Sequence, residues 1–270
     1  MFELSIKRVI GISLVLLATV LLWSLQNRLN HQLDFSTEYT GWILASCVLL
    51  LMGYNIRKRV PFLPLMDNRI WMQIHIYIGF FTAIVFFFHM TDSWPHGEFE
   101  QWLAIGFVCV VMSGFTGLIL YRVIPPLLSI HDESVIYERI PALRWQIKKQ
   151  IDDLVQRSIE EENSTTIADF YRRRLLGFIM TRSVPFSYFS GVHQTIQVWE
   201  GRFNTMKRYL NKNEQILFNE IIELTNQKIE LDYQYVTQRM MKAWLYIHVP
   251  LTLSLLILIS LHILIVYAYL

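Results

Sequence analysis

Long apolar runs separated by short polar stretches set the pattern of this chain. A helix needs roughly 20 apolar residues to cross about 30 Å of hydrocarbon. Every run but the first begins with Trp, as is typical of the aromatic belt where helices leave the lipid core. The pattern predicts an all-α, multi-pass transmembrane helical bundle of about five spans. They lie at residues 9–23, 42–54, 71–89, 102–121 and 244–270, the second being the shortest.

One long polar stretch precedes the last span, and its spacing is helical. Leu143, Ile147 and Ile151 recur on one face, which predicts an amphipathic helix ending near residues 160–163. Residues 166–169 have a capping-box pattern, so a second helix is expected to start there. The stretch is therefore predicted to be a helical insertion between membrane spans.

The helical spacing resumes near Asn213 and continues into the last span, with Lys228 as a polar interruption of its apolar seam. The predicted domains are 1–122 for transmembrane helices 1 to 4, 123–240 for the cytoplasmic insertion, and 241–270 for transmembrane helix 5. The fifth helix is expected to pack with the first four.

Composition and charge agree with a membrane protein and predict its orientation. The chain is 53% hydrophobic and 17% charged, with a net charge of +2. Lys and Arg cluster at one set of span ends, including Lys7, Arg8 and residues 57–59, whereas the other set carries only Arg28. By the positive-inside rule, we expect the N-terminus and residues 123–240 in the cytoplasm, and the C-terminus on the outer side of the cell (inner) membrane.

Motifs for several other cofactors do not occur in the sequence. Cys47 and Cys109, its two cysteines, lie in different predicted spans without a CxxC or CxxCH pattern. This argues against covalent haem, an iron–sulfur cluster or a disulfide framework. No Gly-rich nucleotide loop or dinucleotide fingerprint is present. We therefore expect no nucleotide site in this chain, and no nucleic-acid partner.

Four histidines lie inside the predicted spans in two pairs of equal spacing. His75 and His89 are fourteen positions apart, as are His248 and His262, and a Trp stands four residues before the first His of each pair. Fourteen helical residues return to within roughly 40° of the starting direction over a rise of about 21 Å. Each helix thus presents two imidazoles on one face, one near each membrane surface. Ionisable side chains in a span are costly and indicate function.

Both helices are predicted to run from inside to outside, so the histidines pair by depth. His75 and His248 share the inner level, and His89 and His262 share the outer level. Two facing neutral imidazoles are suitable axial ligands for one iron porphyrin, which predicts two stacked haems. A zinc or copper site would need three or four ligands at one level.

The paired H-x13-H helices resemble those of membrane di-haem cytochromes b, including quinol-oxidising cytochromes and ferric reductase-like proteins. The resemblance covers only the two His-bearing segments. It implies a bundle that carries electrons across the bilayer on two non-covalent b-type haems, with quinone as a further candidate ligand. Ferric reductase-like proteins usually add a flavin and nicotinamide module, which this chain does not have, and the long insertion also departs from these families.

Residues around the histidines are weaker candidates. Arg69, Arg122 and Lys242 could contact haem propionates, although the positive-inside rule explains them equally well. Gly79 and Gly114 could let a porphyrin approach closely, although ordinary helix packing is another explanation. Ser113, Gly114 and Gly117 together give the fourth span a small-residue face.

An iron with two His ligands has no open site for substrate, so electron transfer is the expected role. We expect a subunit of an oxidoreductase complex, without catalytic residues, that connects redox partner subunits or the quinone pool. One alternative is a terminal reductase of ferric ion or quinone that uses an exposed haem edge. Another is a membrane transport or assembly protein whose histidines bind a metal or relay protons.

Overall fold

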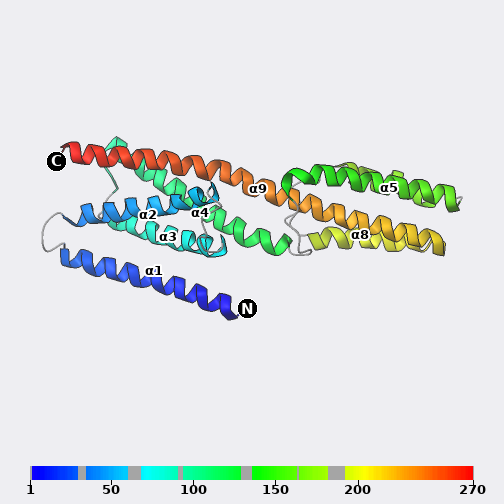
Figure 1. Cartoon of the computed structure of the whole chain (residues 1–270), viewed down its shortest axis with the longest axis horizontal. Coiled ribbons are helices and arrows are strands. Elements are labelled where there is room, and N and C mark those ends of the chain that lie inside the picture. Colours follow the sequence, from blue (N-terminus) through cyan, green and yellow to red (C-terminus); the bar gives the residue numbers. More distant parts are fainter. Residues whose placement is uncertain are drawn as a thin grey trace. The chain divides into compact units, whose positions relative to one another are not determined.

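The computed structural model describes residues 2–29, 35–59, 68–90, 94–128, 136–162, 164–181 and 192–269. These residues are almost entirely helical and contain no strand, so the all-α prediction is confirmed (Figure 1). The helices are α1 (Phe2–Leu29), α2 (Phe35–Arg59), α3 (Asn68–His89), α4 (Glu98–Leu128), η1 (Tyr137–Arg139), α5 (Ile140–Glu162), α6 (Thr166–Phe170), η2 (Tyr171–Leu175), α7 (Leu176–Met180), α8 (Val192–Lys207) and α9 (Lys212–Tyr269).

The chain divides into two compact units. The first contains residues 1–118 and 244–270, and the second contains residues 119–243. Helices α4 and α9 contribute residues to both units, and α9 continues without interruption from the second unit into the last apolar segment. The expectation of a helix that runs straight into the last span is confirmed.

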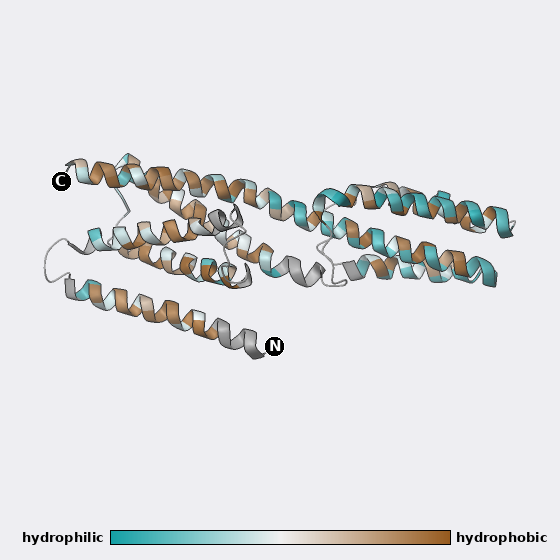
Figure 2. Ribbon diagram, viewed as in Figure 1, coloured by the Kyte–Doolittle hydropathy of each residue, from teal (hydrophilic) through white to brown (hydrophobic). Residues whose placement is uncertain are grey.

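The helices of the first unit are suited to a lipid environment. Segments Val9–Asn27, Ile70–His89 and Glu98–Arg122 and the apolar part of α9 are long and apolar enough to cross a bilayer, and α2 carries a shorter apolar segment, Glu38–Gly53. Figure 2 shows hydrophobic residues along α1 to α4 and the C-terminal part of α9. Large apolar side chains face outward, which suits contact with lipid tails. The protein is therefore a multi-pass, membrane-embedded helical bundle.

All five helices of the first unit contribute to one apolar core. The rings of Phe86 on α3 and Phe107 on α4 stack with their centroids 4.1 Å apart. Helix α3, which carries His75 and His89, also lies close along α1 and α2, and its Val85 and Phe86 are buried in this core. The buried members of the core are Leu22, Leu44, Val85, Phe86, Ala104, Phe107 and Leu255.

The second unit has its own core, and the amphipathic pattern predicts its first long helix well. Ile147 and Ile151 are buried, and α5 ends at Glu162, inside the predicted range. At the start of helix α9, the Glu214 Oε2 accepts the backbone N–H of Asn211 at 2.7 Å, which is one of the two bonds of a capping box. This bond satisfies a backbone donor that the first turn of a helix would otherwise leave unpaired.

One local prediction in the second unit is confirmed for the start of the helix, because α6 begins at Thr166, but is wrong about the cap. Residues 166–169 do not form a capping box, because Thr166 is already the first helical residue and Thr165 flanks the helix without a side-chain cap. The Oγ of Ser164 instead accepts the Thr166 N–H at 3.3 Å. A hydroxyl two residues before the helix therefore takes the role that the sequence pattern gave to Thr166.

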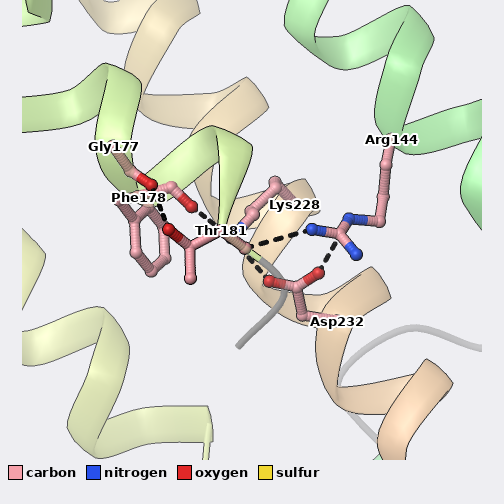
Figure 3. A network of polar contacts seen from close by, with 6 residues as sticks. All are labelled: Arg144, Gly177, Phe178, Thr181, Lys228 and Asp232. Atoms are coloured by element: carbon pink, nitrogen blue, oxygen red, sulfur yellow. Dashed lines mark hydrogen bonds and ion pairs between the residues drawn. The ribbon is translucent and has the colours of Figure 1, made fainter. Parts of the chain in front are cut away.

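Lys228, which interrupts the apolar seam of α9, is buried in a polar network (Figure 3). Its Nζ lies 2.6 Å from the Asp232 carboxylate and donates to the Phe178 carbonyl at 2.8 Å. The other carboxylate oxygen of Asp232 lies 2.9 Å from the Arg144 Nε, and Arg144 also donates to the Thr181 carbonyl at 3.2 Å. Burial lowers the pKa of the Lys228 ammonium, while the Asp232 carboxylate opposes that shift.

Candidate functional site

The structure brings two of the four predicted histidines together. His89, the last residue of α3, faces His262 of α9, with ring centroids 6.5 Å apart and an angle of 88° between the ring planes. Both side chains are half-buried. The two residues are far apart in the sequence, and their predicted pairing by depth rested only on equal spacing along two parallel helices.

Helix α2 positions the His89 ring. The Oγ1 of Thr40 lies 3.2 Å from the His89 Nδ1, and the Thr40 side chain is almost completely buried. At Gly41, a Cβ would lie only 3.0 Å from the His89 Cε1, so the absence of a side chain there gives the ring its space. With Nδ1 bonded to a hydroxyl, Nε2 is the ring nitrogen suited to ligation.

Helix α4 supplies an aromatic neighbour for the second ring of this pair. The rings of Phe99 and His262 are nearly parallel, with an angle of 22° and centroids 6.5 Å apart. Phe99 is half-buried near the start of α4. The His89–His262 pair therefore has side chains from α2 and α4 around it, in addition to α3 and α9, which carry the histidines.

His248 is held by α4 and by its own helix. Its Nδ1 lies 3.1 Å from the Ser113 Oγ, and its ring stacks on Trp244 with centroids 5.0 Å apart. The Trp244 Nε1 donates to the Ser113 carbonyl at 2.8 Å. A Cβ at Gly117 would lie 2.1 Å from the Trp244 ring, so Gly117 is required for this contact.

His75 is half-buried on α3, and its Nδ1 is shielded from solvent. The glycines predicted to pack against a porphyrin, Gly79 and Gly114, have no heavy atom within 4 Å of where a Cβ would stand. Gly117, by contrast, is filled by Trp244. Within the small-residue face of α4, Gly114 therefore has open space beside it, whereas Gly117 makes room for the Trp244 indole ring.

Of the three residues predicted as propionate contacts, Lys242 and Arg122 have described side chains. Lys242 donates to the Glu138 Oε1 at 2.7 Å and lies 4.0 Å from the centroid of the Tyr137 ring. This hydrogen bond holds the pKa of the Glu138 carboxyl below its ordinary value. Arg122 is exposed, and the Arg69 side chain lies outside the described residues. A propionate at Lys242 would have to compete with Glu138.

Sequence reasoning did not identify Thr40, Gly41 or Phe99, and it treated Ser113 only as a small residue. A polar residue followed by glycine at the start of an apolar run is a weak signal, because helical Thr usually bonds to its own backbone. Among the described residues, no group of three or more His, Cys, Asp or Glu could hold a metal ion. No family model, curated protein or solved structure matches the chain.

Proposed function

We propose that this protein is a di-haem b-type membrane cytochrome, with His89 and His262 as axial ligands of one haem and His75 and His248 as those of the other. The geometry of the first pair carries the proposal. Two imidazoles on opposite sides of one metal, with metal–nitrogen bonds of about 2 Å, have ring centroids about 6 Å apart. The 6.5 Å between His89 and His262 fits this arrangement.

The surroundings of the second pair support the same chemistry. His248 bonds through Nδ1 to a hydroxyl, which favours the neutral tautomer whose Nε2 can ligate. The open space beside Gly79 and Gly114 is compatible with a flat apolar ligand. A haem iron with two His ligands supplies one-electron transfer without a site for substrate.

The chain's own residues would bind and orient the two haems at different depths in the bundle, and the apolar helices would keep water from them. We propose that electrons pass across the bilayer between redox partner subunits or the quinone pool. In this proposal the protein lies in the inner membrane of the cell. The distribution of Lys and Arg supports a cytoplasmic location for the N-terminus and for the insertion. The insertion, residues 123–240, would then be a cytoplasmic docking surface or cover.

A visible spectrum of the purified full-length protein in detergent tests this proposal. We expect the reduced bands of bis-His b-type haem at two haems per chain. His89→Ala and His262→Ala should each remove the same haem and leave the other. His96→Ala is the matched control, since His96 is exposed and outside the pairs.

Three results would contradict the proposal. The first is a protein without haem after haem-replete expression. The second is the loss of different haems from His89→Ala and His262→Ala, because that result would break the pairing by depth. The third is the loss of both haems from either variant, because the proposal assigns each histidine pair its own haem.

A further inference from the structure

We propose that Thr40 and Ser113 are positioning residues, each of which fixes the tautomer of one axial histidine and so lowers the reduction potential of one haem. This inference rests on the proposed function. Thr40 acts through His89 and Ser113 acts through His248, so each hydroxyl affects a different haem. The test can therefore separate the two effects within one protein.

The bond at His89 has the geometry of a normal hydrogen bond. The Thr40 Oγ1 lies 3.2 Å from Nδ1, at the upper end of the range for N–H···O bonds. A neutral imidazole that ligates through Nε2 carries its proton on Nδ1, so Nδ1–H donates and the Thr40 hydroxyl accepts. Thr40 is 3% exposed, so bulk water cannot readily replace it as the acceptor.

The bond at His248 has the same form but comes from another helix. The Ser113 Oγ lies 3.1 Å from the His248 Nδ1. The backbone of the same serine accepts the Trp244 N–H at 2.8 Å, and the Trp244 ring stacks on His248. Ser113 therefore holds the imidazole directly through its side chain and indirectly through its carbonyl.

An acceptor on Nδ1–H makes the imidazole a stronger electron donor at Nε2. A stronger donor stabilises ferric iron more than ferrous iron, so the reduction potential falls. Removal of the hydroxyl should therefore raise the potential of the haem concerned. A residue that only filled space would not give a rise in potential that the hydroxyl-retaining variant, Thr40→Ser, reverses.

Redox titration of the purified full-length protein, followed in its visible bands, tests the inference. Thr40→Val keeps the side-chain shape and removes the hydroxyl. We expect a roughly tenfold shift in the ferric–ferrous balance, about 59 mV toward higher potential for a one-electron couple. The shift should affect the haem that His89→Ala removes. Ser113→Ala should shift the other haem in the same direction.

Conservative variants and matched controls keep the result interpretable. Thr40→Ser retains a hydroxyl and should titrate like the wild type. Thr19→Val and Ser24→Ala remove hydroxyls that bond to carbonyls of their own helix, α1, and should leave both potentials unchanged. If Thr40→Val loses its haem but Thr40→Ser keeps it, the hydroxyl requirement is also supported.

Unchanged potentials in both Thr40→Val and Ser113→Ala would overturn the inference while leaving the di-haem proposal intact. Equal shifts of both haems from either variant would overturn it too, since they would indicate a general loosening of the bundle. Loss of haem from Thr40→Val and Thr40→Ser alike would assign Thr40 a packing role. Failure of the wild type to bind haem would instead refute the proposed function.

Discussion

Replacement of Asp232 by Asn should strongly destabilise the second unit. The carboxylate contacts two cations, with Lys228 at 2.6 Å and Arg144 at 2.9 Å, and the Asp232 and Lys228 side chains are 2% and 1% exposed. Removal of one partner from a buried ion pair costs about 3–5 kcal/mol, because the remaining charge is left uncompensated. We expect a value near 3 kcal/mol, since the Arg144 side chain is 15% exposed and water can solvate part of its charge.

Amide hydrogen exchange of the full-length protein in detergent measures this change directly. A loss of about 3 kcal/mol corresponds to exchange that is roughly a hundredfold faster in the protected core. The affected segments should be α5 and the buried part of α9 around Ile229. Glu161→Gln is the matched control, because Glu161 forms an exposed i,i+4 ion pair with Arg157. Such surface pairs contribute up to about 1 kcal/mol.

The pH dependence provides a second check on the same reasoning. Burial lowers the pKa of Lys228 and the Asp232 carboxylate opposes that shift, so the pKa should fall further when the carboxylate is removed. The unfolded variant then binds more protons than the folded one, so its stability should rise with pH up to the ordinary lysine pKa. Adding Lys228→Met to Asp232→Asn should recover much of the loss. Exchange within fivefold of the wild type in Asp232→Asn would refute the argument.

Two further predictions concern other buried groups. Gly117→Ala should displace Trp244 and with it His248, and so weaken binding of the haem assigned to that histidine. Gly53→Ala should not, because no heavy atom lies within 4 Å of the new Cβ. Haem content per chain measures both effects, and equal haem content in the two variants would contradict the packing argument. Burial raises the pKa of Tyr233 from 10.0 to about 12, so the stability it contributes is complete below pH 10 and is lost as pH rises through 12. Tyr233→Phe should remove up to about 2 kcal/mol of the stability loss at alkaline pH, measured by amide hydrogen exchange as a function of pH. An unchanged pH profile of stability would contradict the raised pKa of Tyr233.

The sequence pattern predicted the features that depend on spacing within one helix. The apolar runs predicted the membrane helices, and the intervals between histidines placed two imidazoles on one face of each helix. The Lys228–Asp232 pair also has i,i+4 spacing, although its burial was not predicted. These features follow from helical geometry, which any long apolar segment must adopt in lipid because its backbone needs internal hydrogen bonds.

Contacts between helices could not be predicted in this way. Thr40 and His89 are 49 residues apart, and Ser113 and His248 are 135 apart. Whether such side chains meet depends on the rotation of each helix about its axis and on its depth in the bundle. The side chains at the contact determine both quantities, and no periodicity within one helix encodes them.

The Trp before the second histidine pair shows how a contact between helices changes the explanation of a sequence pattern. From the sequence alone, Trp244 is typical of an aromatic belt. In the structure, it stacks on His248 and donates to the Ser113 carbonyl, and it fits only because position 117 is glycine. An interfacial anchor would require none of these partners. The Trp, the serine and the glycine therefore act together to orient His248, which explains why Trp stands one helical turn before this histidine.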